Sequence, residues 1–538
     1  MTSGPSRIIA AACALAFCVS AWAFTADPGP GLDPDAMSYL GAARTLAAHG
    51  TLRIPMGPWW SDSTSQPLAH FPPGYSTVLS LPIAFGMNAL QGARVVQSLA
   101  AGATAALFVV TLSPVVGALG AALGAVVLAL MPAYAFVHLS VLSEPLYLAF
   151  VMLLLWSFAR RPRAALEHGL IAAAATMVRY AGLSTAGAAA LWALRDSSAS
   201  WRERFKRAGI AVAPSLIAMA AWSLSRERAP DRGQGIRKLA FYGDWGPTLN
   251  EGARTILHQL APSLEWEPTP WLAGIVALIA LVALTWSTVR LSGEVMPAPE
   301  RQDPRWNEQR DVLHATGVIM LAYVALVFAS RLLADHDIPF DFRITVPLVP
   351  LAVAAVTIVA ARAWRVISKP ARVFGVLALL GWTGAAVRAN YQQVKDALAD
   401  GGDFASAEWT NSPTLAWVRT QGAARAIFTN LPCEVWFHLD RQVRNLPNTA
   451  DAKTMLEFAA KLRATNGVMV AWNLQSPETA NTDSIATRAG LVRIATLDDG
   501  SVWEASPVTP LQEALPATAP SAPVTSAPPT VAKPAVRR

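Results

Sequence analysis

Long apolar runs separated by short charged segments fill the first two thirds of the chain. From Val95 to Ser143 there is no Asp, Glu, Lys or Arg, which leaves room for two membrane spans. One span needs about 20 apolar residues, because the hydrocarbon core of a bilayer is about 30 Å thick. The same pattern predicts eleven helices in all, at residues 8–24, 95–112, 115–132, 141–159, 165–180, 181–194, 208–225, 271–290, 312–332, 344–361 and 373–388.

Composition assigns these runs to a membrane protein. Of the 538 residues, 53% are hydrophobic and only 15% are charged, which is too apolar for a soluble domain of this length. The expected fold is mainly α, a polytopic transmembrane domain followed by a small α/β domain. The formal charge of +7 lies mostly in loops, and no basic patch with interleaved aromatic residues indicates a nucleic-acid partner.

The loops also predict orientation, because basic residues are retained on the cytoplasmic side. Lys and Arg gather at 160–163, 195–207, 290–310 and 361–372, which all fall inside if the N-terminus is cytoplasmic. The chain is then expected to be a multi-pass protein of the cytoplasmic (inner) membrane, with its C-terminus outside. One predicted outer loop, RERAPDRGQGIRK, is basic against this rule and contains Arg237 and Lys238.

The first apolar run has a second interpretation. Arg7, the run itself and the small-residue pattern Ala21-Trp22-Ala23 also describe a cleavable signal peptide. Cleavage would leave the rest of the topology unchanged, because residue 25 starts outside in either case.

Three regions are expected. Residues 1–389 form the membrane domain, with a first outer loop at 25–92, and 506–538 form a disordered tail rich in Pro and Ala. Residues 390–505 form an outer α/β domain, with strands at 426–429 and 467–472. A final hairpin, LVRIATLDDGSVWEA, is predicted to turn at Asp499-Gly500.

Candidate chemistry begins in the first outer loop with GLDPDAMSYL. On a helix that starts near Pro34, Asp33 is the expected N-cap, and Asp35 and Tyr39 share one face. A solvated first-turn carboxylate is the plain alternative for Asp35.

Two further segments stand at predicted outer helix ends. His70-Phe71-Pro72-Pro73-Gly74-Tyr75 forms a rigid turn, suited either to a binding loop or to an ordinary helix start. Glu144, before Pro145, is either helix-start chemistry or a functional carboxylate close to hydrocarbon. Asp335-His336-Asp337 resembles a metal cluster, but adjacent residues of an extended loop point apart, which favours hydrogen bonding within the loop.

In this order, the four motifs DxxxY (35–39), FPPGY (71–75), SEPLY (143–147) and VRYAG (178–182) resemble those of the C-type membrane glycosyltransferases. The likeness is to the dolichyl-phosphate-mannose-protein mannosyltransferase-like branch, which includes the bacterial aminoarabinose transferases, and it covers about residues 8–390. The resemblance implies a hexosyl- or pentosyltransferase that moves a sugar from a polyprenyl-phosphate donor to an acceptor on the outer membrane face, with inversion. The acceptor class stays open between a glycolipid, a polysaccharide and a protein.

The resemblance also implies residue roles. Asp35 matches the family's general base, and it is followed by Ala36 where many relatives carry a second acid. Asp35 and Glu144 are implied as ligands if a divalent cation is used. The implied substrate- and phosphate-binding residues are Tyr39, His70, Pro72, Pro73, Tyr75, Glu144, Arg179, Tyr180 and Arg343.

Two functions from other classes compete with transfer. A polytopic transporter or lipid flippase tends to place ionisable residues near the midplane and often repeats its halves, whereas this chain places its acids at outer helix ends and shows no repeat. A non-catalytic assembly or sensor protein would account for the outer domain but not for the carboxylates at the membrane face.

Overall fold

The computed structural model describes residues 4–225, 241, 246–262, 304–333, 338–474 and 479–506. The predicted span at 271–290, the Asp335-His336-Asp337 segment, the pair Arg237 and Lys238, and the tail from 507 lie outside the described residues.

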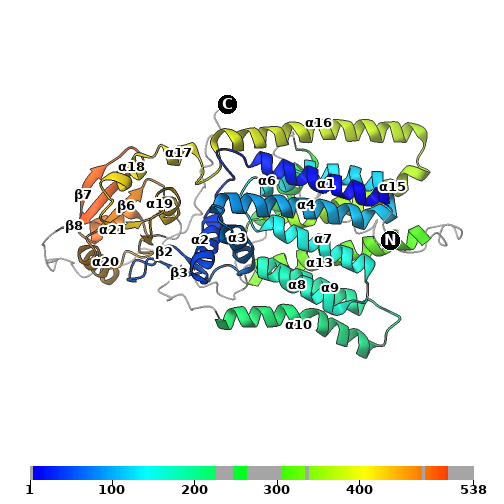
Figure 1. Ribbon diagram of the computed structural model, residues 1–538, viewed down its shortest axis with the longest axis horizontal. Coiled ribbons are helices and arrows are strands. Elements are labelled where there is room, and N and C mark those ends of the chain that lie inside the picture. The colour runs from blue at the N-terminus through cyan, green and yellow to red at the C-terminus, as the bar shows by residue number, and fades with distance from the viewer. Residues whose placement is uncertain are drawn as a thin grey trace.

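Helices dominate up to Asp400 (Figure 1). Most helix limits coincide with polar or helix-breaking residues, such as Asn88, which caps α4 by accepting a hydrogen bond from the Gln91 backbone. The helices of this part are α1 (Gly4–Phe24), α2 (Pro34–His49), α3 (Gly74–Ala84), α4 (Ala89–Val116), α5 (Ala118–Leu130), α6 (Pro132–His138), α7 (Glu144–Arg160), α8 (Ala165–Val178), η1 (Tyr180–Gly182), α9 (Leu183–Leu194), α10 (Trp201–Ser225), α11 (Gly246–Leu260), α13 (Pro304–Leu333), α14 (Phe342–Thr345), η3 (Val346–Leu348), α15 (Val349–Val366) and α16 (Lys369–Asp400).

The chain is a multi-pass membrane protein. In the described part, six helices are long and apolar enough to cross a bilayer, and α5 with α6 makes a seventh if this pair, bent by 68°, counts as one span. Each predicted span within the described residues overlaps a helix, but the span at 115–132 crosses the breaks at Gly117 and Met131, and the one at 344–361 also takes in the end of α14 and η3. The predicted total of eleven is not confirmed. Helices α8 and α9 have 14 and 12 residues and are too short to cross alone, at about 1.5 Å per residue.

An α/β module follows the last long helix. Its helices are α17 (Ala407–Thr410), α18 (Pro413–Thr420), α19 (Pro432–Leu439), α20 (Ala452–Ala464) and α21 (Thr482–Arg488), and its strands are β4 (Ala426–Thr429), β5 (Val443–Asn445), β6 (Gly467–Trp472), β7 (Leu491–Thr496) and β8 (Gly500–Ala505). With β2 (Met56–Gly57), which comes from the first outer loop, the strand order is β2-β5-β4-β6-β8-β7, parallel from β2 to β6 and antiparallel beyond. Every residue of β6 is buried, as expected of a central strand covered on both faces.

The predicted strands at 426–429 and 467–472 match β4 and β6, but the position of the hairpin turn was predicted wrongly. The backbones of Leu497 and Gly500 pair with each other, so the two turn residues are Asp498 and Asp499. The carboxylate of Asp499 accepts hydrogen bonds from the backbone and hydroxyl of Thr414 and from Ser412, both at the start of α18. This tertiary anchor outweighs the local preference of an Asp-Gly turn.

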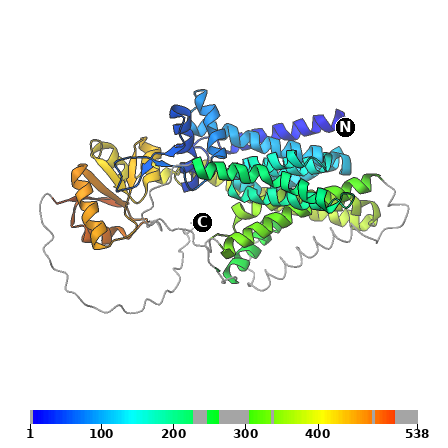
Figure 2. The same ribbon diagram turned by 90° about the horizontal axis from the view of Figure 1, so that it is seen from below.

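The edge strand β2 (Met56–Gly57) comes from the first outer loop, which also forms a short pair between β1 (Arg53–Ile54) and β3 (Gln66–Pro67). Met56 pairs with Val443 in parallel register. Arg444 of β5 donates to the backbone carbonyls of Ser61 and Asp62 at 3.1 and 2.8 Å. Both views place α2 and α3 between the bundle and the module, so the first loop joins the two (Figures 1 and 2).

The fit of β2 into the sheet is expected to depend on Gly57. A Cβ atom there would overlap the backbone carbonyl of Ser63. We expect Gly57→Ala to lower the free energy of unfolding by about 1–3 kcal/mol, as overpacking does. Gly375→Ala is the control, because a Cβ atom at that helical position meets nothing within 4 Å. Thermal unfolding of both purified variants measures the difference, and equal midpoints would contradict the expected clash.

Candidate active site

The site is built around the start of α2. Asp33 is the N-cap, and its Oδ1 accepts a hydrogen bond from the backbone N–H of Ala36 at 2.7 Å. The preceding segment is fixed on both sides by backbone hydrogen bonds. Gly31 pairs with Leu139 and Val141 on one side, and Leu32 pairs with Gly402 and Phe404 on the other. These bonds set where the carboxylates of Asp33 and Asp35 point.

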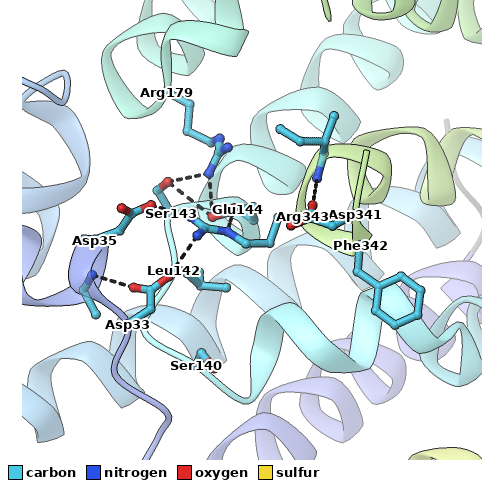
Figure 3. Close-up of polar contacts among 12 residues, drawn as sticks. Asp33, Asp35, Ser140, Leu142, Ser143, Glu144, Arg179, Asp341, Phe342 and Arg343 are labelled. Atoms are coloured by element: carbon cyan, nitrogen blue, oxygen red, sulfur yellow. Dashed lines mark hydrogen bonds and ion pairs between the residues drawn. The ribbon is translucent and has the colours of Figure 1, made fainter. Parts of the chain in front are cut away.

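Arg343 connects three acidic residues from separate parts of the chain (Figure 3). Its Nη1 donates to Asp33 Oδ2 at 2.9 Å, its Nη2 to Asp35 Oδ2 at 2.6 Å and its Nε to Glu144 Oε1 at 2.8 Å. The short helix α14 that carries Arg343 is capped by Asp341, whose Oδ1 accepts from the Ile344 backbone at 3.0 Å. A planar guanidinium suits this arrangement, since its N–H groups point in fixed directions.

Arg179 binds the other side of Glu144. Its Nη1 lies 2.6 Å from Glu144 Oε2 and donates to the Ser143 hydroxyl at 3.0 Å. The backbone of Arg179 is extended between α8 and η1, so its side chain does not follow the helical spacing of α8 and points into the bundle. Glu144 is fully buried as the first residue of α7, and the two guanidinium groups supply the counter-charge that such a carboxylate requires.

Aromatic side chains form the next layer. The ring of Tyr39 lies 4.8 Å from that of Phe71 and 4.9 Å from that of Tyr75, the latter in edge-on geometry. The Tyr39 hydroxyl is 3.3 Å from that of Ser143, which ties this layer to the charged cluster. His70 packs edge-on against Phe71, with ring centroids 4.8 Å apart.

The double proline has a local role. Pro72 is buried, and the carbonyl of Pro73 accepts hydrogen bonds from the backbone and hydroxyl of Thr77 in the first turn of α3. Tyr180, in the first position of η1, makes no hydrogen bond or ring contact to the cluster within the described residues.

Charge in the cluster is nearly balanced, with three carboxylates facing two guanidinium groups. Burial raises the pKa of Asp33 from 3.8 to about 7, and the neighbouring charge of Asp35 adds to this, against the opposing effect of Arg343. Burial also raises the pKa of the Tyr39 phenol, which therefore stays protonated at neutral pH. A proton on Asp33 at neutral pH would leave the cluster neutral.

The raised pKa of Asp33 makes stability depend on pH. Between about pH 4 and 7 the native state holds a proton that the unfolded chain has lost, so the free energy of unfolding falls as the pH rises through this window. Asp33→Asn keeps the N-cap and stays neutral. We expect the variant to gain stability relative to the wild type from pH 4 to 7, measured as the difference between their thermal midpoints.

Asp396→Asn is the control for this prediction, because Asp396 is exposed on α16 and bonds only to Gln392 among the described residues. If the midpoints of Asp33→Asn and the wild type keep a constant difference across the window, Asp33 does not titrate there.

The arrangement of the charged cluster does not favour the predicted role of Asp35 and Glu144 as metal ligands. Within the described residues, no group of three or more His, Cys, Asp or Glu is arranged to hold a metal ion. The guanidinium of Arg343 lies between the carboxylates of Asp35 and Glu144. While Arg343 holds this position the two residues do not fit a divalent cation between them, and no catalytic step is assigned to a metal here.

The structure thus brings Asp35, Tyr39, Glu144, Arg179 and Arg343 together by direct contacts, with Tyr75 and His70 in the aromatic layer. Sequence reasoning missed two residues of the cluster. Asp33 was expected only as a cap, yet its second oxygen binds Arg343. Ser143 was not singled out, although it lies between Tyr39 and Arg179, and its place directly before Glu144 was the available signal.

Comparison with known proteins gives no match in sequence, either to a family model or to a curated protein. Solved structures do match. The crystal structure of ArnT from Cupriavidus metallidurans bound to undecaprenyl phosphate superposes with a TM-score of 0.55 and 12% identity, covering 91% of this chain and 97% of that one. The fold is that of a C-type membrane glycosyltransferase.

A second C-type enzyme also matches. The cryo-EM structure of a mutant of the arabinofuranosyltransferase AftD from Mycobacteria has a TM-score of 0.50 and 15% identity. The match covers 93% of this chain but 41% of that one. At these identities the likeness concerns the fold, and it extends over nearly the whole chain.

Proposed function

We propose that this protein is a glycosyltransferase that moves a sugar from a polyprenyl-phosphate donor to an acceptor hydroxyl, with inversion. The observation that carries the proposal is the position of Asp35. Its side chain is 31% exposed, against 17% for Asp33 and none for Glu144. Asp35 is therefore the carboxylate of the cluster most open to a substrate, and it lies on a fold used for this chemistry.

Arg343 orients Asp35 for the role of general base. Only Oδ2 of Asp35 is bound within the described residues, so Oδ1 is left to accept a proton. In the proposed reaction the acceptor hydroxyl gives its proton to Asp35, its oxygen bonds to the anomeric carbon, and the bond from that carbon to the lipid phosphate breaks. The phosphate leaves with the electron pair, so no separate acid is needed.

The donor phosphate is proposed to bind at Arg179. The described contacts of Arg179 use only Nη1, which leaves the donors on Nε and Nη2 for phosphate oxygens. Arg343, in contrast, uses all three of its nitrogens on carboxylates and is better suited to hold Asp35 in place. ArnT was crystallised with undecaprenyl phosphate, which supports a lipid-phosphate carrier for this chain as well.

The proposal places the reaction on the outer face of the cytoplasmic membrane, with the α/β module on the same side. The acceptor is a glycolipid, a polysaccharide or a protein, and the transferred sugar is a hexose or a pentose. Pro72 and Pro73 are proposed to hold the aromatic layer of Tyr39 and Tyr75 beside the substrates, with His70 at its edge. The same orientation would put the basic loop at 361–372 in the cytoplasm.

The test is a transfer assay with purified protein, a panel of radiolabelled polyprenyl-phosphate sugars and a membrane extract as the source of acceptor. We expect label to enter a product with one donor class and not with free sugar phosphates, since the lipid chain holds the donor in the membrane. If folded protein transfers nothing but moves lipid or solute across vesicles, the protein is a transporter or flippase and the proposal is wrong.

A further inference from the structure

The short helix α14 carries Arg343 to the three carboxylates, yet little of it is buried (Figure 3). Its four residues, Phe342–Thr345, are all only half-buried. The ring of Phe342 packs against that of Phe136 with centroids 6.0 Å apart. Most helices in proteins are stabilised by packing of a buried face, which α14 lacks. The position of Arg343 therefore depends largely on the hydrogen bonds at the two ends of α14.

The C-terminal end of α14 is bound by α13. The hydroxyl of Tyr323 donates to the backbone carbonyl of Ile344 at 2.8 Å, and Tyr323 is only 3% exposed. This contact comes from a helix with the length and composition of a membrane span. The N-terminal end, where Phe340 precedes the Asp341 cap, is left to be fixed by another element.

Helix α11 binds this N-terminal end. The hydroxyl of Thr255 donates to the backbone carbonyl of Phe340 at 2.8 Å, and the carboxylate of Glu251 accepts from the Phe340 N–H at 3.1 Å. Thr255 and Glu251 are four positions apart, so they share one face of the helix. Gly252 lets the two segments approach, because a Cβ atom there would lie 3.2 Å from the Phe340 ring. Both backbone groups of Phe340 are thus held by one helix.

Helix α11 buries polar side chains where it meets its neighbours. Thr255 and Gln259 are 8% and 6% exposed. The apolar Ile256 and Leu260 are 37% and 51% exposed, the reverse of a usual amphipathic helix. Gln259 also bonds to a backbone group, since its Oε1 accepts from the N–H of Ala133 in the first turn of α6 at 3.2 Å. Hydrogen bonds to backbone groups, more than apolar contacts, therefore determine where α11 sits.

We propose that Thr255 and Glu251 are positioning residues for Arg343. By holding Phe340 they fix α14, and α14 directs the guanidinium to Asp35. Thr255 has the larger effect, because its bond is partly buried and a carbonyl left unpaired there costs more than the Phe340 N–H, which water can reach beside exposed Glu251. The inference rests on the proposed function, since it names residues that place the partner of the proposed base.

The first experiment is hydrogen–deuterium exchange of the full chain in nanodiscs. It compares the wild type with Thr255→Val, which removes the hydroxyl at nearly constant shape. We expect the amides of residues 338–345 to exchange about five- to tenfold faster, as loss of one hydrogen bond allows. The amide of Ala36 should also exchange faster, because it bonds to Asp33, which Arg343 holds. Loss of a purely local contact would leave Ala36 unchanged.

Two variants are the controls. Thr255→Ser keeps the hydroxyl and should restore the exchange rates of the wild type. Thr316→Val makes the same chemical change at a residue that is 1% exposed, but its hydroxyl bonds to Val312 within α13, also at 2.8 Å. It should leave the exchange of Ala36 unaltered.

The second measurement is kcat and donor KM, with the radiolabelled polyprenyl-phosphate sugar that the wild type uses. Thr255→Val should lower kcat about 10- to 100-fold, since a displacement of about 1 Å can cost 10² in rate. Donor KM should stay unchanged, because the donor phosphate is proposed to bind at Arg179. In an Arg343→Lys background, Thr255→Val should cause little further loss, because changes that act on one contact are not additive.

Two results would overturn the proposal: exchange of Ala36 at the wild-type rate in Thr255→Val, or a kcat equal to that of Thr316→Val. If Thr255→Val fails to fold, Glu251→Met carries the test. Its control is Glu251→Gln, whose amide oxygen still accepts from the Phe340 N–H. If the wild type transfers no sugar, the proposed function is wrong, while hydrogen exchange still decides whether α11 positions Arg343.

Discussion

Asp35→Asn is expected to lower sugar transfer by about 10²- to 10⁴-fold, the usual contribution of a positioned general base. The amide has the shape of the carboxylate, and its oxygen still accepts the 2.6 Å hydrogen bond from Arg343 Nη2. The geometry of α2 and the contacts of Arg343 should therefore persist, while the ability to take a proton from the acceptor hydroxyl is lost. The measurement is initial transfer rate at saturating donor.

Asp396→Asn provides the reference for this loss, because it makes the same chemical change on an exposed face of α16. Its rate should equal that of the wild type. Thermal unfolding of Asp35→Asn should remain within a few degrees of the wild type, which separates loss of chemistry from loss of fold. A rate for Asp35→Asn within about threefold of wild type is incompatible with the role of base.

Arg343→Met should remove both activity and much of the stability. Methionine fills part of the space but leaves the carboxylates of Asp33 and Asp35 without their cation and leaves buried Glu144 with Arg179 alone. Removing one partner of a buried ion pair typically costs about 3–5 kcal/mol. The free energy of unfolding in detergent with denaturant measures this loss.

Arg44→Met is the matched control for Arg343. Arg44 also pairs with an aspartate, Asp440, at 2.8 Å, but the two side chains are 42% and 66% exposed. An exposed pair contributes about 0–1 kcal/mol, so its loss should be small. Arg343→Lys should recover only part of the stability, since one ammonium cannot reproduce three fixed N–H directions. Equal stability of Arg343→Met and Arg44→Met would show that Arg343 does not hold the cluster together.

Much of the fold could be predicted from the sequence because the signals are local. Apolar runs located helices in the described membrane part, and the runs at 426–429 and 467–472 gave β4 and β6 with their observed limits. The number of spans could not be read in this way, because α8 and α9 are apolar yet short, and the segment from Arg179 to Gly182 separates them. Strand β2 has two residues and no periodicity to detect.

Individual residues of the candidate site could be predicted from the sequence, but the contacts between them could not. Asp35, Glu144 and Arg179 were found because they stand at helix ends in recognisable motifs. The contacts of Arg343 with three carboxylates could not be predicted from the sequence, since they join residues about 200 to 310 positions apart. Asp33 shows why: its N-cap role accounts for one oxygen, and only the tertiary structure shows what the second one binds.

The pairing of Met56 with Val443 has a consequence for biosynthesis. The two residues are 387 positions apart, so at about 5–20 residues per second the ribosome needs roughly 20–80 s to supply the partner strand after Met56 has been made. During this interval β2 has no strand to pair with. The loop that carries the proposed base is thus made early but completed late, and chaperones on that side of the membrane would meet it unpaired.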